Sequence, residues 1–239
     1  MKSLLRYRSV VGVISVLSGL LAAWCMVVGA DAVEYNFDAF SDPVLVLQYA
    51  HNYKAAYWFL LLDLAGYYLL LLPVILYLHK QYEYRSPWNT LFTYSGLAYV
   101  TVGAIGAAML AATWPPLMQD YLAAPEAQKA TIAVVFKAVT LLVTGGLWNI
   151  LEVLFAAVWW IGVGSLLYSE RKALGVVTII TGISTLLDSM GNIFSAPMLA
   201  ETGLNLYLVL GIVWPVWIGI FLVRKTQQEG LYTAARRTE

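Results

Sequence analysis

The sequence predicts an all-α polytopic bundle of six membrane-spanning helices. Its 239 residues are 61% hydrophobic and only 12% charged, whereas a soluble domain is roughly 45–50% apolar and about 25% charged. The mean hydropathy is +0.73. The apolar residues form solid blocks of about 20, the length that a helix needs to cross the hydrocarbon core. A β-barrel would instead show alternating segments of about ten residues.

The six blocks form one transmembrane domain over residues 1–239. The predicted spans are 10–30, 55–78, 88–112, 147–168, 173–194 and 204–223. The first block follows basic residues and ends in Ala30-Asp31-Ala32, which resembles a signal peptide with its cleavage site. The apolar region of a signal peptide is about 7–15 residues long. Because this block is longer, we interpret it as a retained first span.

Composition excludes several other classes of protein. Lys and Arg number 14, as do Asp and Glu, so the chain lacks the basic excess of a nucleic-acid-binding protein. The single cysteine, Cys25, excludes a disulfide scaffold and an intrachain redox pair. His51 and His79 lie at opposite ends of the second span, too far apart to hold a haem together. Because no nucleotide-binding or nucleophile motif occurs, we assign no catalytic residue, metal ligand or cofactor.

The distribution of basic residues predicts the orientation. In the six-span arrangement, 11 of the 14 Lys and Arg residues fall on one side: Lys2, Arg6, Arg8, Lys80, Arg85, Arg171, Lys172, Arg224, Lys225, Arg236 and Arg237. Basic loops remain in the cytoplasm. We therefore expect a multi-pass protein of the inner (plasma) membrane with both termini cytoplasmic and an acidic outer side.

The stretch 130–168 is apolar throughout and longer than one span. As a helix it would measure about 58 Å, nearly twice the hydrocarbon thickness. One long helix, two spans, or an outer helix followed by one span would each account for it. Two spans would place the C-terminal basic cluster outside. We therefore expect an outer helix over 125–144, in or near the outer interface, with a break at Gly145-Gly146.

Three of the spans begin alike. Arg8, Arg85 and Arg171 are each followed ten residues later by a pair of small residues: Ser18-Gly19, Ser95-Gly96 and Thr181-Gly182. This pattern is typical of three helical hairpins repeated in the same direction, as in some transporters. Small residues are also common wherever membrane helices touch. In either case we expect these pairs to mark close helix packing.

Three acidic residues lie within the spans, where a charge is costly and often functional. Each has a polar neighbour on its own helical face: Asp63 with Tyr67, Glu152 with Asn149, and Asp188 with Asn192. If the helices converge, these six residues would line an outward-facing pocket that binds a cation, protons or a small polar ligand. Lys137 would neutralise one acid. Alternatively, each acid only fixes packing with a neighbouring helix or reaches the headgroups.

The stretch 166–176, with Gly182 and Leu187-Asp188-Ser189, carries a family resemblance. Its order of "LLY", a short polar turn, "LGV", a Gly and "LLD" resembles a family of uncharacterised prokaryotic six-helix membrane proteins, described only as a domain of unknown function. The resemblance is best over 147–195. It implies the same architecture and no established activity, and it places Asp188 within a motif.

Three functions remain compatible with the sequence. The first is a small transporter or ligand-binding protein that uses the intramembrane acids. The second is an accessory or assembly subunit, either a homo-oligomer or the partner of another membrane protein. The third is an intramembrane enzyme that acts on a lipid headgroup with a carboxylate pair. Membrane lipids are expected partners under all three functions. The first and third functions require the intramembrane acids to lie close together, whereas the second does not.

Overall fold

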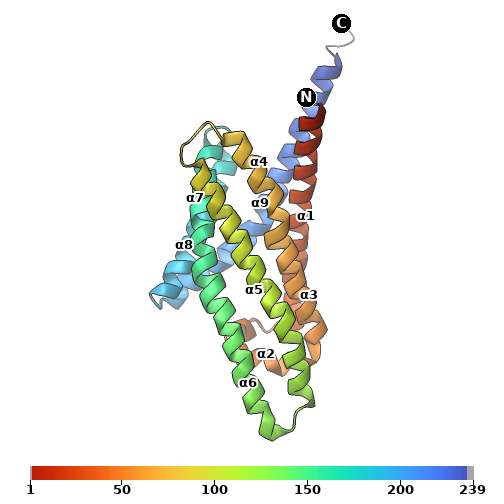
Figure 1. The fold of residues 1–239 in the computed structure, drawn as a ribbon, viewed down its shortest axis with the longest axis vertical. Coiled ribbons are helices and arrows are strands. Elements are labelled where there is room, and N and C mark those ends of the chain that lie inside the picture. The colour runs from red at the N-terminus through yellow and green to blue at the C-terminus, as the bar shows by residue number, and fades with distance from the viewer. Residues whose placement is uncertain (1, 236–239) are drawn as a thin grey trace.

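The computed structural model describes the backbone of residues 2–235 and the side chains of residues 5–228. Within these residues the chain is helical, with short loops and no strand (Figure 1). Six helical runs are long and apolar enough to cross a membrane, which confirms the predicted six-span bundle. They are Leu5–Ala32, Pro43–Tyr82, Asn89–Ala123, Glu126–Tyr168, Lys172–Ile193 and Pro197–Gln228.

Several of these runs consist of more than one type of helix. The elements are α1 (Lys2–Ala32), η1 (Phe37–Phe40), α2 (Pro43–Val46), η2 (Leu47–Asn52), α3 (Tyr53–Asp63), η3 (Leu64–Tyr68), η4 (Leu69–Leu71), α4 (Leu72–Tyr82), α5 (Asn89–Ala123), α6 (Glu126–Leu141), η5 (Leu142–Glu152), α7 (Val153–Tyr168), α8 (Lys172–Ile193) and α9 (Pro197–Ala235). Of these, η3 and η5 are π-helical, with wider turns than an α-helix.

The structure places a helix over most of 125–144 but has no break at Gly145-Gly146, where the sequence indicated one. Helix α6 continues through η5 into α7 without a loop, so Gly145 and Gly146 lie inside a π-helical turn instead of at a break. The combined run has 43 residues, or about 65 Å, roughly twice the hydrocarbon thickness. With α5 it extends well beyond the hairpin of α8 and α9 (Figure 1). The sequence offers no proline or polar turn that would end the helix there.

Helices α1 and α9 lie side by side, and both chain ends lie at the same end of the bundle (Figure 1). We call this the terminal end, and the opposite one the far end. A Cβ added at Gly219 of α9 would lie 2.5 Å from the Gly12 carbonyl oxygen of α1. Gly19 likewise faces the Ile212 carbonyl, at 2.7 Å. The backbones therefore approach each other closely where glycine removes the side chain.

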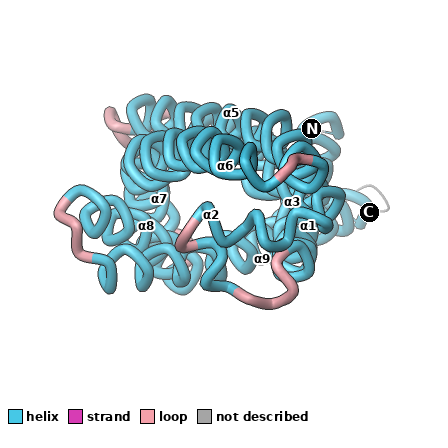
Figure 2. The backbone as a smooth tube through the Cα atoms, turned by 90° about the horizontal axis from the view of Figure 1, so that it is seen from below, coloured by secondary structure: helices cyan, strands magenta, loops and turns pink. Residues whose placement is uncertain are grey.

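The other two small-residue pairs also pack closely. A Cβ at Gly96 would meet the Trp159 ring of α7, and one at Gly182 would lie 2.7 Å from the Ile161 amide nitrogen of the same helix. Together with Gly19, this confirms the expectation that the pairs mark close helix packing. Seen along the bundle, the short α2 lies beside α6 at the far end (Figure 2).

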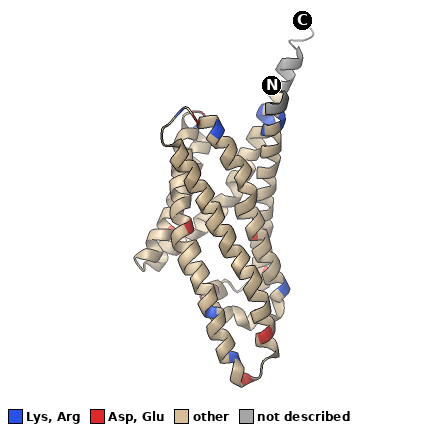
Figure 3. Ribbon diagram, viewed as in Figure 1, with Lys and Arg blue, Asp and Glu red and all other residues tan. Residues whose placement is uncertain are grey.

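Two hydrophobic clusters fill the bundle. The cluster nearer the terminal end includes Trp159, Trp160 and Trp214, while the far-end cluster includes Trp114 and Phe136. Phe59 and Trp148 pack against both clusters and so mark the level at which the two clusters meet. Most Lys and Arg residues lie at the terminal end, with Lys54, Lys129 and Lys137 toward the far end, and few charged residues occur along the middle of the bundle (Figure 3).

Candidate functional site

The three intramembrane acids lie at the boundary between the two clusters. Asp63 ends α3, Glu152 ends η5, and Asp188 lies in the last two turns of α8. Along the chain, Asp63 follows Leu60 of the far-end cluster and precedes Tyr67 of the other. Both Asp63 and Asp188 are within electrostatic range of Glu152. Three separate spans thus bring three carboxyl groups into one region of the bundle.

The acids are largely enclosed by other side chains. Glu152 and Asp188 are only 2% and 1% exposed. Asp63 is partly exposed as a residue, yet its Oδ2 is shielded from solvent and has no hydrogen-bond partner among the described residues. The Oδ2 atom of Asp188 is shielded and unpartnered in the same way. Buried polar atoms normally have partners, so these two oxygens retain unused capacity to bind a proton or a donor.

A phenol from a second π-helical segment reaches Glu152. The Tyr68 hydroxyl donates a hydrogen bond of 3.1 Å to Glu152 Oε2, and both residues are buried. Tyr68 ends η3, while Glu152 ends η5. Tyr68 is the fifth residue after Asp63. In a π-helix, residues five apart lie on one face, so the wide turn directs Tyr68 toward the acids.

Helix α5 accommodates both π-helical segments with glycine. A Cβ at Gly103 would overlap the Tyr68 ring, and one at Gly106 would overlap the Trp148 indole from η5. The Trp148 Nε1 also donates to the Gly103 carbonyl oxygen at 3.2 Å. Glycine at these two positions therefore lets the aromatic side chains of η3 and η5 approach the α5 backbone.

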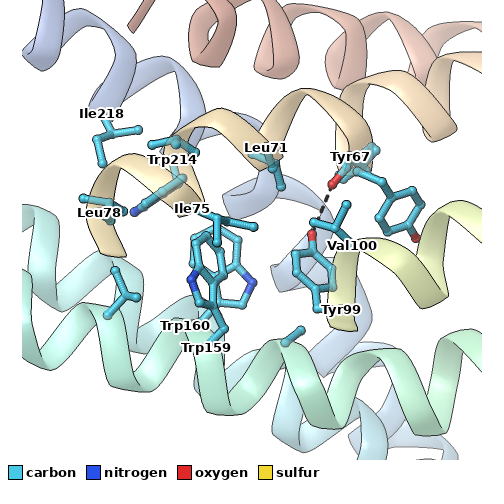
Figure 4. Close-up of a cluster of buried hydrophobic side chains, with 14 of the residues drawn as sticks. Tyr67, Leu71, Ile75, Leu78, Tyr99, Val100, Trp159, Trp160, Trp214 and Ile218 are labelled. Carbon is cyan, nitrogen blue, oxygen red and sulfur yellow. Dashed lines mark hydrogen bonds between the residues drawn. The ribbon is translucent and has the colours of Figure 1, made fainter. Parts of the chain in front are cut away.

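A chain of tyrosines lies beside the acids. The Tyr99 hydroxyl lies 2.8 Å from the Tyr207 hydroxyl. It also donates to the Tyr67 carbonyl oxygen at 3.2 Å (Figure 4). Tyr67 was expected to accompany Asp63, but its own hydroxyl donates to the Leu208 carbonyl oxygen of α9 at 3.1 Å. Tyr68, Tyr99 and Tyr207 were not among the predicted site residues. In the sequence, the one feature that could have identified them is a tyrosine hydroxyl within an otherwise apolar span.

Asp188 and Asn192 form the expected pair on one face of α8. The Asn192 Nδ2 donates to Asp188 Oδ1 at 2.8 Å and to the Asp188 carbonyl oxygen at 2.9 Å. Asp188 is buried, whereas Asn192 is partly exposed near the end of the helix. The amide therefore lies between the buried carboxyl group and the surface.

Two predicted residues are not brought to the acids. Lys137 is exposed on α6, fifteen positions before Glu152 and thus about 22 Å away along the helix. Asn149 makes no hydrogen bond to Glu152 in the described chain, because the π-helical turn changes which residues share a face. The ion pairs of Lys and Arg among described residues are Arg85–Glu170 and Lys129–Glu126, so none of these pairs neutralises the three acids.

The expected outward-facing pocket stays a prediction. Two surface grooves, one between α1 and α9 and one along α7, are lined almost wholly by apolar residues, and neither touches an acid. In the part of the chain that the structure describes, no three His, Cys, Asp or Glu residues are arranged to hold a metal ion. The chemistry available at the site is therefore that of enclosed carboxyl and phenol groups.

Comparison with known proteins adds no family or activity. The chain matches no protein-family model, no curated protein and no solved structure. The resemblance to a six-helix family of unknown function stays a prediction.

Proposed function

We propose that this membrane protein is a small transporter that binds and releases protons at the cluster Asp63, Glu152 and Asp188. The supporting observation is that Asp63 and Asp188, from two other spans, each lie close enough to Glu152 for their charges to interact, with no ion pair to Lys or Arg among the described residues. Neighbouring carboxylates cannot all be ionised cheaply, and a charge inside the membrane is costly. Binding a proton removes both costs.

The arrangement favours protons over a metal cation. Calcium takes six to eight oxygen ligands and magnesium requires near-octahedral geometry, but in the described chain no three His, Cys, Asp or Glu residues are placed to hold a metal ion. A proton needs only one oxygen atom. The unpartnered Oδ2 atoms of Asp63 and Asp188 meet that requirement, and Tyr68 supplies a hydrogen bond to Glu152.

Access to the cluster is proposed from the far end of the bundle. On that side, the partly exposed Asn192 links Asp188 to the surface. Toward the terminal end, Trp159, Trp160 and Trp214 are fully buried and contact one another, with ring centroids 4.4–5.6 Å apart (Figure 4). Such a layer excludes water, so protons would enter on the side of Asn192.

The distribution of charge supports the orientation of this route. Lys and Arg gather at the terminal end (Figure 3), and the positive-inside rule places that end in the cytoplasm. Under this orientation both termini are cytoplasmic, the protein resides in the inner membrane, and protons arrive from outside the cell. The π-helical segments η3 and η5 resemble the discontinuous helices that form transporter sites. They would rearrange when Tyr68 and Glu152 separate.

Infrared spectroscopy tests the proposal directly. A membrane film of the protein is perfused with buffers of different pH, and the band of protonated carboxyl groups is followed. We expect a reversible band in the wild type that is reduced in Asp63→Asn, Glu152→Gln and Asp188→Asn. Asp120→Asn, which alters an exposed acid of α5, is the control. If the three variants give the wild-type spectrum, the cluster does not exchange protons.

One observation favours the accessory-subunit function as a second candidate. Helix α5 and the continuous run of α6, η5 and α7 are longer than a bilayer is thick, and this run exposes apolar side chains such as Val134 (68%) and Leu142 (62%). Under this function, we propose that another membrane protein covers that face. A photo-crosslinking residue at position 134 would capture the partner in native membranes, whereas one at Val209, an exposed residue of α9, would not.

A further inference from the structure

A groove runs along the outer surface of the bundle between α1 and α9, remote from the three acids. Each helix contributes residues at the spacing of a single helical face. The groove is lined by Val13, Val16, Leu17, Leu20, Ile220, Val223, Arg224 and Gln227. Leu17 and Leu20 are 45% and 57% exposed, so side chains of the protein do not fill the groove. It lies on a surface that faces lipid when the six helices span a membrane.

The groove is apolar along most of its length and polar at one end. On α9, Ile220 and Val223 are followed by Arg224 and Gln227 toward the terminal end. The α1 side is aliphatic throughout. Behind the groove, Gly12 and Gly219 bring the two backbones together, which closes its floor. An elongated apolar surface that ends in a cation matches a molecule with a hydrocarbon chain and an anionic head.

Arg224 is the basic residue among those that line the groove. The neighbouring Lys225 lies over the Phe221 ring, 5.9 Å from its centroid, and Arg171 lies over the same ring at 4.6 Å. Arg224 is exposed and makes no ion pair with the residues that the structure describes. A guanidinium presents paired N–H donors that fit a phosphate.

We propose that this groove is a binding site for an anionic glycerophospholipid. One acyl chain would lie between α1 and α9 against Leu17 and Ile220, while the lipid phosphate would accept hydrogen bonds from the Arg224 guanidinium and the Gln227 amide. The site is independent of the carboxyl cluster. It would retain a specific lipid at the α1–α9 contact, with its head at the terminal end of the bundle.

Site-specific fluorescence quenching tests this proposal in vesicles that contain the full chain. A bimane label is attached to Leu17→Cys in the groove, and to Val209→Cys on an exposed part of α9 away from it. The native Cys25 is buried, and the unsubstituted chain serves as the labelling blank. Brominated phosphatidylglycerol or brominated phosphatidylcholine is added at equal low mole fraction, and the relative association constant at each label is obtained from the quenching.

At position 17 we expect the anionic lipid to associate about five-fold more strongly, the factor expected for one cation near the surface. Arg224→Gln should reduce the ratio to about one, whereas Lys225→Gln should leave it unchanged. The label at position 209 should show no preference. Equal association of both lipids with the wild type, or a preference that survives Arg224→Gln, would overturn the proposal. A label at position 17 that neither lipid quenches would show protein in the groove, which also overturns it.

Discussion

The hydroxyl of Tyr68 donates to the carboxyl group of Glu152, and this bond joins two π-helical segments that are far apart in the sequence. Each segment comes from a different span and rests on a glycine of α5. A change in the backbone geometry of one segment would therefore shift the other segment through this hydrogen bond. The Tyr68 hydroxyl is also the described hydrogen-bond donor to Glu152, the acid that lies near both of the others.

Removing this phenol should destabilise the protein. Tyr68→Phe keeps the ring but leaves Glu152 Oε2 buried without its described donor, which costs about 1–3 kcal/mol for a buried polar atom. Unfolding in a denaturing detergent, followed by the reactivity of the buried Cys25, measures the effect. Tyr94→Phe, at an exposed position of α5, is the control and should change stability little. Equal stability of the two variants would show that the bond contributes nothing.

Glycine 103 should be required for the position of Tyr68. In Gly103→Ala the new methyl group would overlap the Tyr68 ring, and crowding of this kind typically costs about 1–3 kcal/mol. Gly145→Ala is the matched control, because a Cβ there meets nothing within 4 Å and alanine favours helix by up to about 1 kcal/mol. Thermal unfolding in detergent should place the Gly103 variant well below the Gly145 variant. The reverse order would contradict the described packing.

The amide of Asn192 should matter more than that of Asn149. Asn192→Leu leaves Asp188 Oδ1 without its donor, so we expect a loss of about 1–3 kcal/mol in unfolding free energy and slower proton exchange at Asp188. Asn149→Leu removes an amide that makes no such bond and should change stability by less than about 0.5 kcal/mol. Denaturation curves of the two variants measure the difference. Similar losses would indicate that position 192 has no special role.

Replacing Lys137 should leave the carboxyl cluster unaffected. Its side chain is exposed on α6 and lies about 22 Å of helix from Glu152. Lys137→Gln should therefore give the wild-type infrared band of protonated carboxyl groups over the whole pH range. A changed band in this variant would revive the prediction that this cation neutralises one of the acids.

The number of spans could be predicted from the sequence because a bilayer demands one simple property, a long apolar block. The way in which α6 ends could not be predicted from the sequence. Gly145-Gly146 indicated a break, but a broken helix would leave backbone N–H and C=O groups without partners inside a largely apolar stretch. The structure keeps the helix continuous and widens its turns. The position of Lys137 depended on that break, and its expected contact with the acids disappears with it.

The acids themselves could be predicted because an intramembrane carboxyl group is costly and therefore conspicuous. Their partners could not all be predicted. Asn192 lies four residues after Asp188, an α-helical spacing, and was expected. Tyr68 lies five residues after Asp63, a π-helical spacing, and no sequence pattern predicted a π-helix there. Tyr99 and Tyr207 are two of 16 tyrosines in the chain. Only the hydrogen bond between their hydroxyl groups, which links α5 to α9, distinguishes them from the others.

The most direct test of the central claim is the charge displaced when the protein takes up protons. The protein is adsorbed on a solid-supported membrane and exposed to a rapid pH jump, and the transient current is integrated. We predict a displaced charge in the wild type that is absent when Asp63, Glu152 and Asp188 are replaced together by their amides, in a variant that still unfolds cooperatively. An equal charge in that variant, or no charge in the wild type, would contradict proton binding at these three residues.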